Sequence, residues 1–254
     1  SAYPLKGTTP GWHIRSRKGW GRKELELLAG FQIHHLPPVM PVLSASSSVL
    51  PFQDAGGFLE KVEPETTLWQ YALRYESARS GWNEQQVFER AGFILAAMRH
   101  SLEQGLKGRE LPGSLLPTQV KAFQKADQDR KLVHGTVQNR MILYVTAIME
   151  SKAGLEAIVA APTAGSCAAL PAALLALADD MEIPDETLVR GLLTAGLIGI
   201  FIAKGATFSA ELGGCMAECG SASGMAAAGL TEMMGGSPAE ALSAASVAVQ
   251  NMFG

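Results

Sequence analysis

The sequence has few of the features that mark secreted, nucleic-acid-binding or membrane-surface proteins. It holds only three cysteines in 254 residues, too few and odd in number for a disulfide framework. Charged residues make up 18% of the chain and the formal net charge is −3, which gives no basic footprint for nucleic acid or an anionic membrane. No charged leader precedes an apolar segment at the N-terminus. We therefore expect a cytoplasmic protein that acts on small molecules or binds protein partners.

The chain also lacks strand-like alternation of apolar and polar residues, so a sheet-based fold is not expected. From Glu65 onward the apolar spacing is helical. One helix is expected to open at Asn83 with Gln86 closing a capping box, and another at Ser237 with Glu240. The same spacing predicts helices near 68–79, 117–130, 135–151, 167–180, 185–203 and 221–234. The sequence predicts an all-α fold.

The longest apolar run, Gly191 to Ala203, lies between Arg190 and Lys204. As a helix it would extend only about 20 Å, which is too short to span a membrane. The helices from about 167 onward consist largely of Ala, Gly, Ser and Met and are apolar all round. Such helices must be surrounded by others. We expect them to form the small-residue core of a multi-helix bundle.

Residues 1–64 differ from the rest because they are rich in proline, as in "HHLPPVMPVLS" (34–44). Proline fixes φ and removes a donor, so this segment is interpreted as an irregular arm or linker, and 65–254 as an all-α domain. The basic stretch from His13 to Lys23 is interpreted as part of the solvated arm, with RNA contact as the alternative.

The stretch "ELGGCMAECGSASGMAAAGL" (211–230) combines two cysteines with many glycine, serine and alanine residues, whose side chains are absent or small. The Gly213-Gly214 pair predicts that Cys215 lies at a turn or helix start, where the helix dipole favours a thiolate. Cys219 and Cys167 are interpreted as small buried hydrophobic residues. No C-x2-C pair or neighbouring histidine supports a four-ligand zinc site.

Two further segments offer polar groups between apolar helices. In "AAPTAGSCAAL" (160–170), Thr163, Gly165 and Ser166 precede a helix and are candidate ligands for a substrate anion, with simple capping by Ser166 as the alternative. In "IAKGATFSAELGGC" (202–215), the candidate catalytic residues are Lys204, Ser209 and Glu211. For Lys204 the alternative is a favourable interaction with the end of its own helix.

Three segments together resemble one family: "IVAAPTAGSCAALPAAL", "LIGIFIAKGATFSAELGGCMAECGSASGMAAAGL" and the terminal "QNMFG". They are similar to the alpha, or catalytic, part of the iron–sulfur-dependent L-serine dehydratases of bacteria. The resemblance implies a [4Fe–4S] cluster held by three cysteines, whose open iron acts on the serine hydroxyl. Cys215 matches one ligand position, and the other two ligands are expected beyond Gly254, after the segment Asn251-Met-Phe-Gly254.

The resemblance further implies conversion of L-serine to pyruvate and ammonia. It also implies a beta subunit or domain that carries a substrate-binding segment absent from this chain, with a homo-oligomer as a further assembly. An L-cysteine desulfidase of the same superfamily is the enzymatic alternative, because substrate choice depends on contacts that spacing does not reveal. A non-catalytic helical scaffold or interaction subunit is the alternative from another class.

Overall fold

The computed structural model describes residues 2–5, 11–14, 50–63, 65–111 and 116–253. The chain divides into two compact units, Ser1–Leu43 and Ser44–Gly254. The expected irregular stretch 34–44 and most of the basic stretch lie outside the described residues.

The first unit contains a two-stranded antiparallel hairpin, where the sequence predicted irregular structure. Its strands are β1 (Ala2–Leu5) and β2 (Gly11–Ile14), and the register pairs Ala2 with Ile14. The expectation was wrong here because each strand has only four residues, too few for an alternating pattern to stand out.

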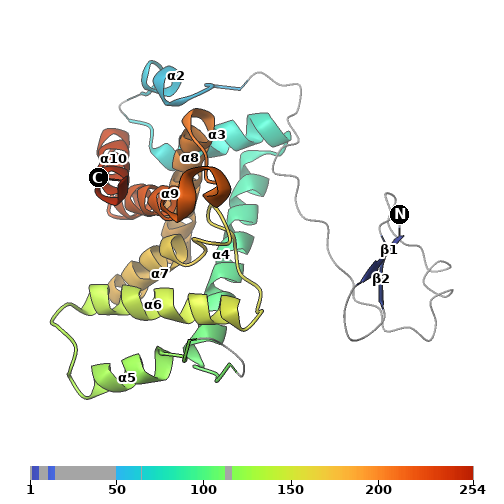
Figure 1. Cartoon of the computed structure of the whole chain (residues 1–254). Coiled ribbons are helices and arrows are strands. Elements are labelled where there is room, and N and C mark those ends of the chain that lie inside the picture. The colour runs from blue at the N-terminus through green and yellow to red at the C-terminus, as the bar shows by residue number, and fades with distance from the viewer. Residues whose placement is uncertain (1, 6–10, 15–49, 64, 112–115, 254) are drawn as a thin grey trace. The chain divides into compact units, whose positions relative to one another are not determined.

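The second unit confirms the all-α prediction in its described residues. Figure 1 shows α5 and α6 at one end of this unit and α2 and α3 at the other. The helices are α2 (Ala55–Leu59), α3 (Leu68–Ser80), α4 (Glu84–Leu106), α5 (Val120–Gln128), α6 (Thr136–Ala153), α7 (Ala169–Met181), α8 (Asp185–Gly205), α9 (Ala210–Met233) and α10 (Pro238–Phe253).

Both predicted capping boxes are confirmed. The Gln86 amide N–H donates to Asn83 Oδ1 at 2.9 Å, and the Asn83 N–H donates to Gln86 Oε1 at 3.0 Å. At the start of α10, the Ser237 N–H donates to Glu240 Oε2 at 2.8 Å. Each box satisfies backbone donors that the first helical turn leaves without partners, so local sequence fixes where α4 and α10 begin.

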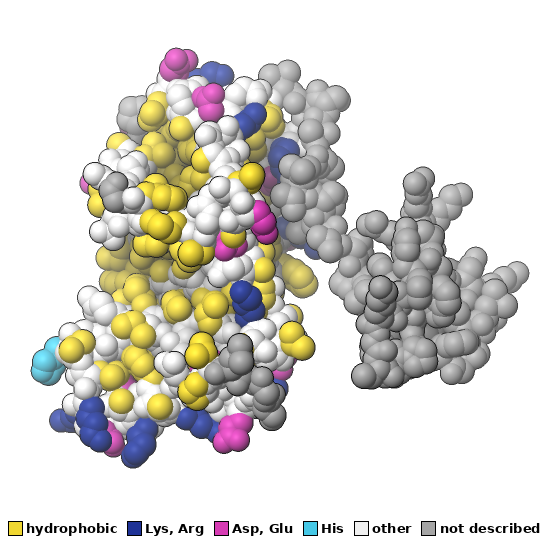
Figure 2. Space-filling view, viewed as in Figure 1, with side chains coloured by type: hydrophobic (Ala, Val, Ile, Leu, Met, Phe, Trp, Pro, Cys, Tyr) yellow, Lys and Arg dark blue, Asp and Glu magenta, His cyan; other side chains and the backbone are white. Residues whose placement is uncertain are grey.

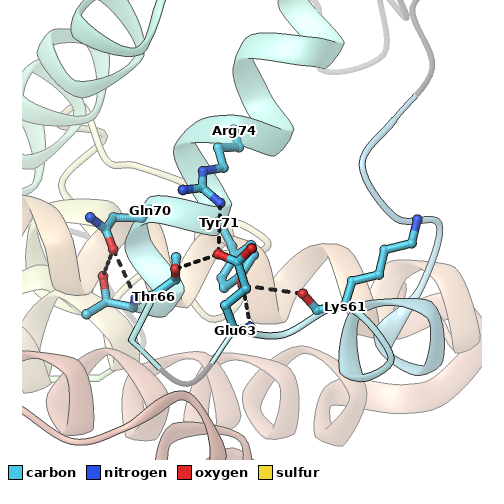
Figure 3. Close-up of polar contacts among 7 residues, drawn as sticks. Lys61, Glu63, Thr66, Gln70, Tyr71 and Arg74 are labelled. Atoms are coloured by element: carbon cyan, nitrogen blue, oxygen red, sulfur yellow. Dashed lines mark hydrogen bonds and ion pairs between the residues drawn. The ribbon is translucent and has the colours of Figure 1, made fainter.

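The helical unit begins earlier than the sequence indicated. The segment 44–64, expected in the arm, belongs to the second unit, and α2 in it places Phe58 in the core. Figure 3 shows how the chain then enters α3. Tyr71 Oη accepts a hydrogen bond from the Glu63 N–H at 2.7 Å, and Thr66 Oγ1 donates to the Glu63 carboxylate at 3.0 Å. Arg74 lies 3.9 Å from that carboxylate. These contacts hold the α2–α3 connection against α3.

The core of the unit is formed around α9, which packs against α7, α8 and α10. The small residues along α9 allow this close packing, as the composition predicted. Among the described residues, α8 is one helix whose length and composition would allow it to cross a membrane, a property that core helices share. It packs against α3, α4 and α9, and its Leu188 and Leu197 are almost fully buried.

Replacement of Gly105 with alanine is expected to destabilise the helical unit by about 2 to 3 kcal/mol. A Cβ at Gly105 would lie 1.9 Å from the backbone oxygen of Ala147, so α4 and α6 would have to separate. Urea unfolding followed by circular dichroism measures the change. Gly196→Ala is the matched control, because a Cβ there has no neighbour within 4 Å. Equal stability of the two variants would contradict this account of the helix contact.

Candidate functional site

The segment between α6 and α7 forms a compact polar turn. The Ala161–Pro162 peptide bond is cis, and the Ala161 N–H donates to the Thr163 carbonyl at 3.2 Å. Ser166 is buried, and its hydroxyl lies 3.2 Å from Thr163 Oγ1 and 3.4 Å from the Ala161 carbonyl oxygen. The capping position of α7 is Ala168, with no side-chain cap. The Ser166 hydroxyl is therefore part of the turn and does not cap the helix.

Glu218 of α9 completes this cluster, and sequence reasoning missed it. Thr163 Oγ1 donates a hydrogen bond of 2.6 Å to Glu218 Oε1. The carboxylate also lies against Gly165, where a Cβ would be 2.3 Å from Oε2. A charged residue within a stretch rich in Ala, Gly, Ser and Met was the sequence signal that could have identified it. The structure thus brings Thr163, Gly165 and Ser166 together with a carboxylate.

The thiols lie on the same helix as Glu218. Gly214 has φ 72° and ψ 175°, a left-handed φ that suits glycine, and it interrupts α9 immediately before Cys215. The Cys215 thiol is exposed at this restart, which agrees with the predicted helix start. The helix as a whole begins at Ala210, earlier than the predicted 221, because the break affects a single residue.

Cys219 follows one turn later and is partly buried. Burial raises the pKa of its thiol, and the neighbouring Cys215 and Glu218 raise this pKa further. Cys215 lies three residues before Glu218 and four before Cys219 on α9, so the three side chains lie on one side of the helix. Cys167 is 1% exposed and burial raises the pKa of its thiol, as expected for a small buried hydrophobic residue.

The structure places the other candidate residues at the junction of α8 and α9. Lys204 is exposed in the last turn of α8. Ser209 precedes α9 and its hydroxyl donates to Glu211 Oε2 at 2.5 Å. This hydrogen bond lowers the pKa of the exposed Glu211 carboxyl. Within the described part of the chain, none of the three contacts the cluster of Thr163, Ser166 and Glu218 through a hydrogen bond or ion pair.

The end of α10 lies beside the cysteine-bearing half of α9. A Cβ at Gly220 would be 2.6 Å from the ring of Phe253, so the two helices touch at this point. Gly220 directly follows Cys219 in the chain. Figure 1 shows α9 and α10 packed together. The C-terminal turn of α10 therefore lies against the residue that follows Cys219.

The residues around Cys215 suit part of a metal-cluster site. The Cys215 thiol is exposed, and a Cβ at the preceding Gly214 would meet nothing within 4 Å, which leaves space for a bulky inorganic group. No group of three His, Cys, Asp or Glu that could hold a metal ion is found among the described residues. Among the described residues, Cys215 is therefore a candidate for one ligand position.

Comparison with known proteins agrees with the geometry. The sequence profile of the serine dehydratase alpha chain family matches residues 63–254. A probable L-serine dehydratase, alpha chain, from Bacillus subtilis (strain 168) is 33% identical over 171 residues, covering 67% of this chain and 57% of the relative. The L-serine dehydratase, alpha chain, of Peptoniphilus asaccharolyticus is 33% identical over 188 residues, covering 74% and 64%.

A third relative, named L-serine dehydratase, comes from Streptomyces coelicolor (strain ATCC BAA-471 / A3(2) / M145). It is 33% identical over 211 residues, which cover 80% of this chain and 45% of the relative. The chain thus spans less than two thirds of the length of these three relatives. The profile match includes both the polar turn and the whole of α9. This chain belongs to the serine dehydratase alpha chain family.

Proposed function

We propose that this chain is the alpha part of a cytoplasmic L-serine dehydratase that converts L-serine to pyruvate and ammonia. The observation that carries the proposal is the hydrogen bond of 2.6 Å from Thr163 to Glu218. This hydrogen bond connects the polar turn with the helix that bears Cys215. The turn offers polar groups that suit an amino-acid substrate. The names of the relatives support L-serine as the substrate.

We propose a [4Fe–4S] cluster as the cofactor, with Cys215 as one of its three ligands and two further cysteines beyond Gly254. The proximity of Phe253 to Gly220 supports this arrangement, because residues that follow α10 would begin beside the neighbour of Cys219. When bound, the cluster would supply an open iron that acts as a Lewis acid toward the substrate hydroxyl.

The chain's own residues would bind and orient the substrate. The amide N–H groups of Ala164 and Gly165 donate to no acceptor among the described residues, so they remain free for the substrate carboxylate. The hydroxyls of Thr163 and Ser166 hold the turn that presents these amides. Lys204, Ser209 and Glu211 stay candidate catalytic residues that would have to approach the site from the α8–α9 junction.

An anaerobic assay of the full-length, iron-reconstituted protein tests the proposed function. L-Serine and L-cysteine are offered separately, and pyruvate and sulfide are measured. We expect rapid pyruvate formation from L-serine and little sulfide from L-cysteine. Preferential sulfide release would identify a cysteine desulfidase instead, and no product from either amino acid would favour the non-catalytic scaffold.

Ser166→Ala is expected to raise KM for L-serine by about tenfold while iron content is retained. The loss of the hydroxyl removes its contacts with Thr163 and Ala161 and loosens the turn, at a cost of about 1 to 1.5 kcal/mol of substrate binding. Steady-state kinetics and iron analysis of the same preparation measure the two effects. An unchanged KM would remove Ser166 from the substrate site.

We also propose that a beta subunit or domain completes the enzyme, since two of the relatives are named alpha chains. An exposed apolar stripe on α6, formed by Ile142, Val145 and Met149, is consistent with a partner surface. Figure 2 shows hydrophobic side chains gathered over the middle of one face of the helical unit. Purification of the chain with a co-expressed beta chain tests the assembly.

A further inference from the structure

The Glu218 carboxylate has no cationic partner in the described part of the chain. No Lys, Arg or His recorded there forms an ion pair with it, although other carboxylates of the helical unit have such partners. The donor of its recorded hydrogen bond is uncharged, because it is the Thr163 hydroxyl. A partly buried carboxylate without a counter-ion favours the binding of a cation, because the charge is only partly compensated by water.

The surroundings of Glu218 limit what that cation can be. Oε1 is occupied by the Thr163 hydroxyl, and Oε2 lies against Gly165, the residue whose amide we assigned to the substrate carboxylate. A cation at Oε2 therefore has an anion-binding amide beside it. An α-amino acid carries an ammonium group and a carboxylate on one carbon, so its charges match this pair of groups.

We propose that Glu218 binds the α-ammonium group of the substrate and so selects amino acids over hydroxy acids; this inference rests on the proposed function. The contact is a charge-assisted N–H···O hydrogen bond of about 2.8 Å. Thr163 holds the carboxylate in orientation, and Gly165 leaves the space that the carboxylate needs.

The negative charge of Glu218 argues against the simpler idea that the whole turn of residues 163–166 binds the substrate carboxylate. The Thr163 hydroxyl donates its proton to Glu218 and is not available to donate to a substrate oxygen. A second carboxylate placed at Oε2 would face a like charge at close range, which is unfavourable. The substrate carboxylate must therefore lie on the amide side of Gly165 and the ammonium group on the Glu218 side.

The test compares ligand binding to the wild-type protein and to Glu218→Gln, which keeps the shape of the side chain and removes its charge. Both are full-length, anaerobically reconstituted proteins. The ligands are L-alanine, which has no hydroxyl to lose, and propanoate, which is L-alanine without its ammonium group. Isothermal titration calorimetry gives both dissociation constants, and iron analysis and circular dichroism report the cluster and the fold.

We expect Glu218→Gln to weaken L-alanine binding by about tenfold to hundredfold and to leave propanoate binding unchanged or tighter. Glu103→Gln, which removes an exposed carboxylate on α4, should change neither constant. Equal weakening of both ligands by Glu218→Gln, or no effect on L-alanine, would overturn the inference.

The two proposals can fail separately. A wild-type protein that forms pyruvate from L-serine, combined with a Glu218→Gln variant that binds L-alanine normally, keeps the dehydratase and rejects the ammonium contact. A wild-type protein that binds neither ligand and forms no pyruvate rejects the proposed function and this inference with it.

Discussion

Replacement of Gly165 with alanine is expected to lower kcat/KM for L-serine by about hundredfold while the helical unit stays folded. The new Cβ would lie within 2.3 to 2.5 Å of three atoms of the Glu218 carboxyl group. These atoms are at the end of a flexible side chain, so the carboxylate can move aside at little cost to the fold. That movement breaks the contact with Thr163 and displaces the group that orients the substrate. Displacements of about 1 Å in a substrate-positioning group are enough for a hundredfold loss.

Steady-state kinetics and thermal unfolding of Gly165→Ala measure the two effects separately. Gly196→Ala is the matched control because its Cβ meets no neighbour and it lies in the interior of α8. The control should keep full activity and gain about 0.5 to 1 kcal/mol of stability, as a glycine in a helix interior usually does when replaced with alanine. A Gly165→Ala enzyme with normal kcat/KM would show that the contact between Gly165 and Glu218 has no part in the reaction.

Cys215→Ser is expected to abolish both cluster binding and dehydratase activity in the full-length protein. A serine hydroxyl is a much poorer ligand for iron–sulfur iron than a cysteine thiolate, because these clusters select soft thiolate ligands. Because Cys215 is exposed and follows the break at Gly214, its replacement should leave the helical content unchanged. Iron and sulfide analysis, visible absorption spectra and circular dichroism measure the outcome.

Cys167→Ala is the control for general loss of a cysteine. Cys167 is buried, so this variant should lose about 1 to 2 kcal/mol of stability and retain its iron. Normal iron content in Cys215→Ser would remove Cys215 from the ligand set. Loss of iron in both variants would mean that the cluster is sensitive to packing and not specifically to Cys215.

Local signals allowed much of the helical fold to be predicted. The capping boxes at Asn83 and Ser237 fix the starts of α4 and α10 through hydrogen bonds within four residues of each other. The all-apolar helices required burial and are found around α9. Capping boxes and apolar helices depend on residues that are close in the sequence, so the spacing of residue types predicts them.

The features that were missed depend on contacts between distant segments or on a single backbone angle. The paired strands Ala2–Leu5 and Gly11–Ile14 are too short to show alternation. The early start of α9 depends on Gly214, which interrupts the helix without ending it. The link between Thr163 and Glu218 joins residues 55 positions apart, and no local pattern could indicate that pairing.

The sequence grouped only some of the candidate residues as they lie in the structure, for the same reason. Thr163, Gly165 and Ser166 are neighbours in the sequence and form one turn in the structure. Lys204, Ser209 and Glu211 were grouped by their density in the sequence, but α8 ends and α9 begins among them. The end of α8 and the start of α9 determine where these three side chains lie. Among the described residues, no hydrogen bond or ion pair connects them with the turn of Thr163 and Ser166.

The most direct test of the account is the electron paramagnetic resonance spectrum of the anaerobically reconstituted, reduced full-length protein, recorded with and without L-serine. The account predicts about four irons per chain, a cluster spectrum that L-serine changes, and loss of that spectrum in Cys215→Ser. A protein that forms pyruvate from L-serine without bound iron, or a cluster spectrum that L-serine leaves unaltered, would contradict it.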